Sequence, residues 1–271
     1  MVEKRRASVN KASRVRRGMS KESAAILVGT SGWTYASWRG RFYPPELKSQ
    51  QFLEFYAKEF PTTEINYSFY HLPKPQTYAK WAQQVPAHFL FAVKASRFIT
   101  HIKRLQDVHE SWRIFVENAR ALGPHLGPIL LQFPPSFSCD LQRLEAFLMF
   151  VCERTSGVRV VCEFRHESWF DRTVYRLLKR YHVALCIADS PRYPRADVIT
   201  TDFAYYRYHG RTELFASCYS DTELREEAKL ITRAAGACRT VFVYFNNDAY
   251  GYAVDNARTL RQFLTSSSLA E

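Results

Sequence analysis

A repeated alternation of two patterns constrains the fold of this chain more than any other feature. From residue 26 onward, short apolar runs alternate with amphipathic stretches whose apolar residues recur every three or four positions. The apolar runs predict eight strands, at 26–30, 62–66, 89–94, 128–133, 159–164, 183–189, 204–209 and 240–246. The amphipathic stretches predict seven helices, at 46–60, 75–85, 108–122, 140–153, 171–181, 222–235 and 254–264.

Eight strands alternating with helices over roughly 240 residues are typical of a (β/α)8 TIM barrel. We therefore predict an α/β fold with a single barrel domain at 24–266. Two prolines and no clear helical pattern follow the sixth strand, so we expect the sixth helix to be weak or missing. A doubly wound open sheet is the alternative. It is disfavoured because no glycine-rich phosphate loop follows the first strand.

Composition excludes several other classes of protein. Apolar residues make up 46% of the 271 residues and charged residues 24%, which rules out wholesale disorder. No apolar run reaches the roughly 18 residues of a membrane-spanning helix, so we expect no membrane partner. The six cysteines are scattered without a C-x-x-C pair, so they indicate reduced thiols rather than a zinc site. With no secretory signal pattern, we expect a cytoplasmic protein.

Half of the net charge of +12 sits in a short segment at the start of the chain. Residues 1–23 contain eight basic and two acidic side chains. We predict a disordered tail there and a frayed end at 267–271. Three interpretations of the tail stay open: it binds a polyanion such as nucleic acid, it is a transit-like leader, or translation begins at Met19.

Polar side chains follow the apolar strands at the ends where each strand stops. These strand-end residues are Glu64, Asn66, Lys94, Gln132, Glu163, Arg165, His166, Asp189, Arg207, His209, Tyr244, Asn246 and Asn247. Side chains two positions apart on a strand point the same way, so Glu163 pairs with Arg165, and Arg207 with His209. The intervening positions are apolar, as expected where strands face helices. We therefore expect the charged pairs to point inward at the carboxyl-end mouth, where barrel enzymes place their sites.

The charges of this predicted ring are balanced, which favours acid–base chemistry over a dedicated metal cage. Carboxylates and imidazoles transfer protons, and the basic residues suit an anionic group. We predict four catalytic residues: Glu163, Glu64, His209 and Asp189. We predict ten substrate-binding residues: Lys94, Arg165, Arg207, Asn66, Gln132, His166, Tyr244, Asn246, Asn247 and Trp33. Trp33 either packs a loop or stacks on a ring-shaped ligand.

The leading hypothesis is an enzyme, either a hydrolase, a lyase or an isomerase, acting on a small polar or anionic metabolite without a cofactor. A divalent metal held by Glu163, Asp189 and His209 is a second hypothesis, and it points to a metal-dependent phosphodiesterase or nuclease. A third hypothesis is a small-molecule binding protein without catalysis. Alternatively, the charged residues of the predicted ring form an ion-pair network that stabilises the fold and binds no ligand.

Nine segments in order carry a resemblance to a known family. They are GTSGWTYASWRGRFYP, EINYSFYHLP, FAVKASRFITH, LGPILLQFPPSF, CEFRHESWF, LCIADSP, YYRYHG, YSDTEL and YFNNDAYGYAVDNA. On these segments the sequence, from about residue 27 to 264, resembles the YecE-like domain-of-unknown-function family, number seventy-two. The resemblance implies a TIM barrel. It implies no activity, and the basic tail is not part of it.

Overall fold

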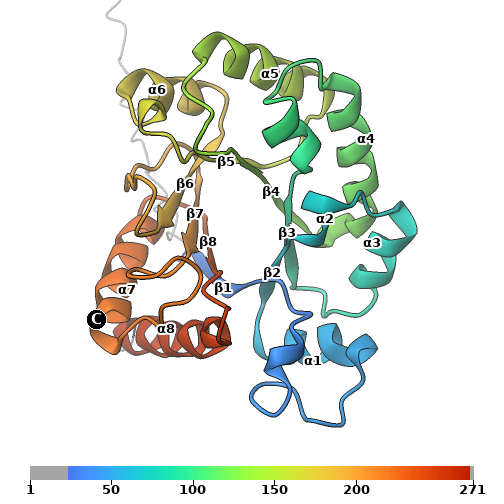
Figure 1. The fold of residues 1–271 in the computed structure, drawn as a ribbon, viewed down its shortest axis with the longest axis vertical. Helices are drawn as coiled ribbons and strands as arrows, with labels where there is room; N and C mark the ends of the chain where they lie inside the picture. The colour runs from blue at the N-terminus through green and yellow to red at the C-terminus, as the bar shows by residue number, and fades with distance from the viewer. Residues whose placement is uncertain (1–23, 269–271) are drawn as a thin grey trace, which may run out of the picture.

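Eight parallel strands close into a barrel in chain order in the computed structural model, with helices around the outside (Figure 1). The structure describes residues 24–268, so the predicted tail at 1–23 and residues 269–271 lie outside the described residues. The strands are β1 (Ala25–Ser31), β2 (Thr62–Ile65), β3 (Leu90–Lys94), β4 (Leu126–Gln132), β5 (Val160–Glu163), β6 (Ala184–Asp189), β7 (Phe203–Tyr208) and β8 (Thr240–Phe245). The predicted TIM barrel is confirmed, and the open-sheet alternative is wrong because β1 pairs with β8.

The predicted helices are present. The α-helices are α1 (Phe52–Glu59), α2 (Tyr67–Tyr70), α3 (Pro75–Ala82), α4 (His109–Ala119), α5 (Leu141–Arg154), α6 (Arg172–Arg180), α7 (Asp221–Ala235) and α8 (Tyr252–Ser268). Helix α1 begins later than its pattern predicts, after a 3-10 turn at Ser49–Gln51. Further 3-10 turns lie at Ala36–Trp38, Arg120–His125 and Glu167–Trp169, and a π-helical turn at Phe98–Ile102.

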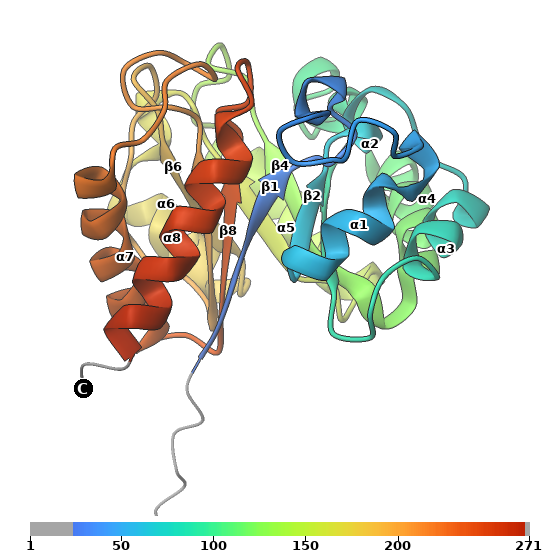
Figure 2. The same cartoon turned by 90° about the horizontal axis from the view of Figure 1, so that it is seen from below.

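Helix boundaries follow from capping side chains. Asp140 accepts a hydrogen bond from the Arg143 backbone N–H, and Asp171 accepts one from Thr173, which fixes the starts of α5 and α6. Ser220 caps α7 within a capping box. Helix α8 lies outside β1 and β8 and continues to Ser268, into the segment expected to be frayed (Figure 2). Of the described helices, none is long and apolar enough to span a membrane.

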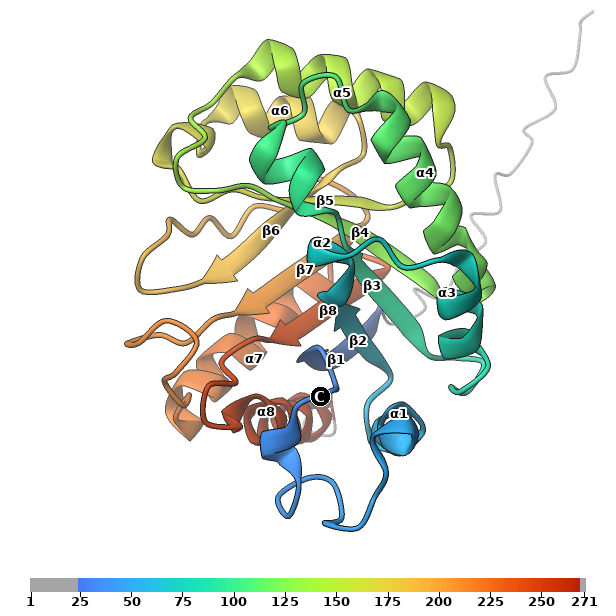
Figure 3. The same ribbon diagram turned by 45° about the vertical axis from the view of Figure 1, so that its right-hand side comes forward.

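The chain returns from β6 to β7 without a helix, as the two prolines predict (Figure 3). Residues 190–202 are all described, and side chains hold them in place. Thr200 Oγ1 donates to the Val183 carbonyl at 2.6 Å and accepts from the Leu185 N–H at 2.8 Å. These bonds tie the end of the segment to the start of β6.

Strand alternation divides the core into two parts. One small cluster fills the barrel interior and includes Ala92, Leu130, Val161, Tyr205 and Phe242. A larger cluster lies between the strands and the helices. Side chains at successive strand positions therefore have different surroundings, and the carboxyl end of the interior is the place where polar side chains meet.

Candidate functional site

Four charged residues form a buried group at the mouth of the barrel, here called the central ion cluster: Glu64, Glu163, Arg165 and Arg207. Arg207 lies between the two glutamates. Its Nη2 donates to Glu64 Oε1 at 2.7 Å, and its Nη1 donates to Glu163 Oε2. Arg165 Nε donates to Glu163 Oε1 at 2.8 Å. The side chains of Arg207 and both glutamates are at most 1% exposed, so these charges depend on one another.

Strand register explains why Glu64 is fully paired. Ser31 on β1 lies opposite Glu64 on β2, and its Oγ donates to Glu64 Oε1 at 2.8 Å. Tyr205 precedes Arg207 by two positions, so both point inward, and its hydroxyl donates to Glu64 Oε2 at 2.6 Å. With Arg207, Glu64 accepts three hydrogen bonds and has no exposed surface.

Glu163 is also held as a carboxylate. Burial alone would raise its pKa, but the positive charges of Arg207 and Arg165 outweigh burial and hold the pKa well below its ordinary value. Arg165 is additionally stacked on Tyr193, with the guanidinium carbon 4.5 Å from the ring centroid. Both glutamates therefore position arginines.

His209, next to this cluster, is fully buried and neutral. The Asn246 amide nitrogen lies 3.1 Å from His209 Nδ1. Because an amide N–H only donates, Nδ1 accepts and Nε2 carries the proton, 3.5 Å from Glu163 Oε1. Burial, followed by the charge of Arg207, lowers the pKa of His209 to about 4. The imidazole is therefore a neutral donor near pH 7.

Lys94 ends β3 and contributes an unpaired charge at the mouth. Its Nζ lies 4.1 Å from the centroid of the Phe69 ring, a cation–π distance. Within residues 24–268 its ammonium group forms no ion pair or hydrogen bond. Burial and the charge of Arg207 lower the pKa of Lys94 to about 7. The two carboxylates and two guanidinium groups of the central ion cluster cancel. Lys94 therefore adds a positive charge that this cluster does not compensate.

His101 and Gln132 lie beside Lys94. Burial, followed by the charge of Lys94, lowers the pKa of His101 to about 4. Its Nε2 lies 3.4 Å from Gln132 Nε2, and Gln132 also donates to the Phe133 carbonyl at 2.7 Å. Sequence reasoning did not identify His101, because it lies in the π-helical turn after β3, where strand alternation gives no signal.

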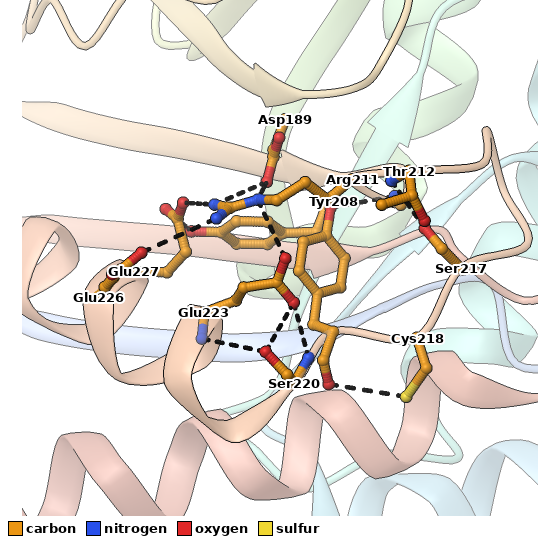
Figure 4. Close-up of polar contacts among 12 residues, drawn as sticks. Asp189, Tyr208, Arg211, Thr212, Ser217, Cys218, Ser220, Glu223, Glu226 and Glu227 are labelled. Carbon is orange, nitrogen blue, oxygen red and sulfur yellow. Dashed lines mark hydrogen bonds and ion pairs between the residues drawn. The ribbon is translucent and has the colours of Figure 1, made fainter.

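Asp189 lies in a second group, here called the rim ion cluster: Asp189, Arg195, Arg211 and Glu227. Figure 4 shows Arg211 between Asp189 and the glutamates of α7. Arg195 and Arg211 both donate to Glu227, at 2.7–2.8 Å, and the Tyr208 hydroxyl donates to it at 2.8 Å. Burial raises the pKa of Asp189, although Arg211 and Arg195 oppose this shift. The Asp189 carboxylate is thus directed to the rim arginines and not to Glu163 or the His209 imidazole, although the Asp189 carbonyl accepts from the His209 backbone N–H at 2.9 Å.

Three other predicted site residues also lie away from the central ion cluster. His166 Nδ1 accepts from the Ser168 N–H and caps the 3-10 turn Glu167–Trp169. Asn247 donates to Asn256 Oδ1 at 2.8 Å and to the Ser217 carbonyl. Trp33 packs edge-on against Trp81, because the chain turns at Gly32, whose φ is +98°.

Two further predicted residues lie near the mouth but outside the ion pairs. The Tyr244 ring packs against that of Tyr205, with centroids 5.1 Å apart and planes tilted by 44°, and the Tyr244 hydroxyl lies 2.7 Å from Thr62 Oγ1. Asn66 follows β2, and its Oδ1 is buried without a partner among the described residues. Tyr244 therefore supports the interior, whereas Asn66 retains an unused acceptor.

The described side chains offer no evident metal centre. Among residues 24–268, no three His, Cys, Asp or Glu side chains are grouped to hold a metal ion. The proposed set of Glu163, Asp189 and His209 is not brought together, because Asp189 pairs with the rim arginines. The six cysteines are all free thiols.

The sequence is similar to those of two UPF0759 proteins. The chain is 27% identical over 270 residues to the UPF0759 protein YunF of Bacillus subtilis (strain 168), covering 88% of this chain and 94% of that protein. It is 27% identical over 170 residues to the UPF0759 protein YecE of Escherichia coli (strain K12), covering 61% of this chain and 59% of that protein.

Two solved structures share the fold. A DUF72 family protein from Thermotoga maritima MSB8 is 28% identical with a TM-score of 0.76, covering 89% of this chain and 99% of that one. A second DUF72 family protein, from Enterococcus faecalis V583, is 20% identical with a TM-score of 0.74, covering 89% of this chain and 95% of that one. The family model described as "Protein of unknown function DUF72" matches residues 27–270. The chain therefore belongs to the DUF72 family, as its sequence segments indicate.

Proposed function

We propose that the protein is an enzyme acting on a small anionic metabolite at the carboxyl-end mouth of the barrel. In this proposal Lys94 and Arg165 bind the anion, and the Lys94 ammonium group acts as the general acid: it donates a proton to the bound substrate and becomes a neutral amine. The observation that carries the proposal is the unpaired Lys94 beside a cluster whose other charges cancel. An anionic group placed there compensates the positive charge that Lys94 adds to this cluster.

The roles differ from those that residue types alone suggest. Both carboxylate oxygens of Glu163 accept from arginines, and those of Glu64 accept from Arg207 and two hydroxyl groups. We therefore assign the two glutamates to positioning Arg207 and Arg165. An amine that titrates near the working pH is suited to general acid–base catalysis. Neutral His209 would donate a hydrogen bond from Nε2 to Glu163 or to a substrate oxygen. The free cysteines support a reducing compartment such as the cytoplasm.

A ligand screen by thermal shift tests this proposal. The panel contains small carboxylates, sugar phosphates and uncharged analogues of the same size, with and without chelator. A specific ligand at about 100 times its Kd stabilises by about 2.7 kcal/mol. Lys94→Met should abolish the anion response, whereas Lys103→Met, which removes an exposed lysine from the same loop region, should retain it.

Three outcomes separate the candidate functions. Anion binding with turnover of the bound compound supports an enzyme. Tight anion binding without turnover would identify a binding protein instead. If Lys94→Met responds like the parent protein, or if only uncharged analogues bind, the proposed site is wrong.

A further inference from the structure

A second concave site lies outside the barrel wall, between α1 and α3. The cavity measures about 630 Å³ and is bounded by the loops that follow β1 and β2. Sites for small molecules commonly measure about 300–1,000 Å³. Ile65, which lines this cavity, faces the outer core, whereas its neighbour Glu64 faces the interior. The cavity is therefore on the opposite side of β2 from the central ion cluster.

Aromatic side chains form one wall of this cavity. The Trp33 and Trp81 rings have centroids 5.4 Å apart and planes at 88° to each other. Tyr67 lies at the rim and is 55% exposed. Two rings at right angles do not sandwich a flat ligand. A puckered ring instead places its C–H face on one indole and its polar edge toward the remaining lining.

The rest of the lining combines the aliphatic Leu53 and Ile65 with polar side chains, and it is almost uncharged. Four amide side chains, Asn66, Gln50, Gln76 and Gln84, join the serine and threonine hydroxyls of the lining. An amide both donates and accepts, as does a ligand hydroxyl group. The buried Oδ1 of Asn66 lacks a partner among the described residues and is an acceptor for a ligand O–H.

The charges of the lining narrow the ligand class. No aspartate or glutamate lines the cavity, which disfavours a cationic ligand, and Lys80 is the lone charged residue among the lining residues. Balanced donors and acceptors around aromatic walls match an uncharged compound rich in hydroxyl groups. We propose that this cavity binds a neutral hydroxylated ring, of the monosaccharide type. The site is independent of the proposed chemistry at Lys94.

Saturation-transfer NMR and tryptophan fluorescence test this proposal with defined probes. Glucose, galactose and N-acetylglucosamine supply neutral rings. Sorbitol supplies similar hydroxyl groups without a ring, and glucosamine adds a positive charge. We expect at least one neutral ring to bind and to change tryptophan fluorescence, with weaker binding of sorbitol and glucosamine.

Two neighbouring glutamines provide matched variants. Gln84 lines the cavity, whereas Gln83 is exposed and does not. Loss of a ligand hydrogen bond in Gln84→Ala should weaken the binding by about three- to tenfold. Gln83→Ala should bind like the parent protein. Trp81→Ala should remove the fluorescence response to the sugar, and circular dichroism checks its fold.

Specific results would overturn the proposal. These are no response to any of the three rings, equal binding of sorbitol and glucose, or equal weakening by Gln83→Ala and Gln84→Ala. Binding that is lost in Lys94→Met but kept in Gln84→Ala would place the sugar at the barrel mouth instead.

Discussion

The protein contains two ion clusters, each defined here by two carboxylates and two guanidinium groups, in different settings. Arg195 of the rim ion cluster also pairs with Asp197 at 2.9 Å. The central ion cluster joins strand ends inside the barrel, and its Arg207 side chain is 1% exposed. The rim ion cluster joins β6 and the loop after β7 to α7 and the segment 190–202, and its Arg211 side chain is 33% exposed. The same kinds of charged group are therefore buried in one cluster and partly exposed in the other.

The location of each cluster indicates its purpose. The rim ion cluster holds the segment where a helix is missing, because Arg195 from that segment is bound to Glu227 of α7. It substitutes for the packing that a sixth helix would supply. The central ion cluster instead borders Lys94, whose charge is not compensated. We conclude that the rim cluster serves the fold, and we propose that the central cluster prepares a site.

The largest expected difference between the clusters is in stability. Arg207→Ala leaves two buried carboxylates without their shared partner and should lower the free energy of unfolding by about 3–5 kcal/mol. Arg211→Ala removes a partly exposed arginine and should cost about 1 kcal/mol or less. Urea unfolding of both variants measures the difference. If Arg207→Ala does not fold, Arg207→Lys provides a milder comparison. Equal losses would contradict the distinction between the clusters.

The next effect concerns the rim cluster and the segment that it holds. Glu227→Ala removes the acceptor shared by Arg195, Arg211 and Tyr208, and should cost about 1–3 kcal/mol. Amide exchange in 190–202 should accelerate, because Arg195 loses its anchor. Anion binding at Lys94 should not change.

Glu226→Ala is the matched control for this experiment. Glu226 lies next in the chain, is exposed, and approaches Arg211 only at 3.8 Å. Its removal should leave exchange in 190–202 as in the parent protein. If amide exchange in 190–202 does not change in either variant, the rim ion cluster does not hold that segment.

A third prediction uses pH to distinguish Lys94 from the paired residues. Its pKa of about 7 lies below that of an unfolded lysine, so between these values the unfolded chain binds a proton that the folded chain does not. The free energy of unfolding should therefore rise with pH above about 7, through this window. Lys94→Met should reduce that slope, and Lys103→Met should not. Parallel profiles for all three proteins would refute the low pKa.

The smallest effects come from single hydroxyl groups. Ser31→Ala removes a donor to Glu64, and Tyr208→Phe removes a donor to Glu227. Glu64 keeps its one arginine and Glu227 keeps both of its arginines, so each change should cost about 1 kcal/mol in urea unfolding. Similar costs would show that the contrast between clusters arises from the arginine charges. A much larger cost for Ser31→Ala would show that the contrast between the clusters arises from the hydrogen bonds of Glu64.

Strand alternation made much of this arrangement predictable from the sequence. Glu64, Lys94, Glu163 and Arg207 each share a face with interior residues, and the structure places them at the mouth. The same alternation, applied strictly, explains why the Asp189 side chain does not point into the barrel. It shares a face with Ile187, which belongs to the outer core, whereas Cys186 and Ala188 line the interior.

The outward-facing residues follow the same logic. Asn247 shares parity with Phe245, and His166 with Phe164, and both aromatic residues lie in the outer core. The pairing partners could not be predicted, because they depend on register between strands that are distant in sequence. His101 and the cavity beside Trp33 depend on loop geometry, which has no periodic signature.

The central claim is that Lys94 is an uncompensated amine, and NMR titration of its side chain tests this most directly. Lysine labelled at Cε and Nζ gives one signal for each residue, and Lys94→Arg assigns the signal of interest. We predict a midpoint near pH 7 that rises when an anion binds. A midpoint at the ordinary lysine value of about 10.4, unchanged by anions, would contradict it.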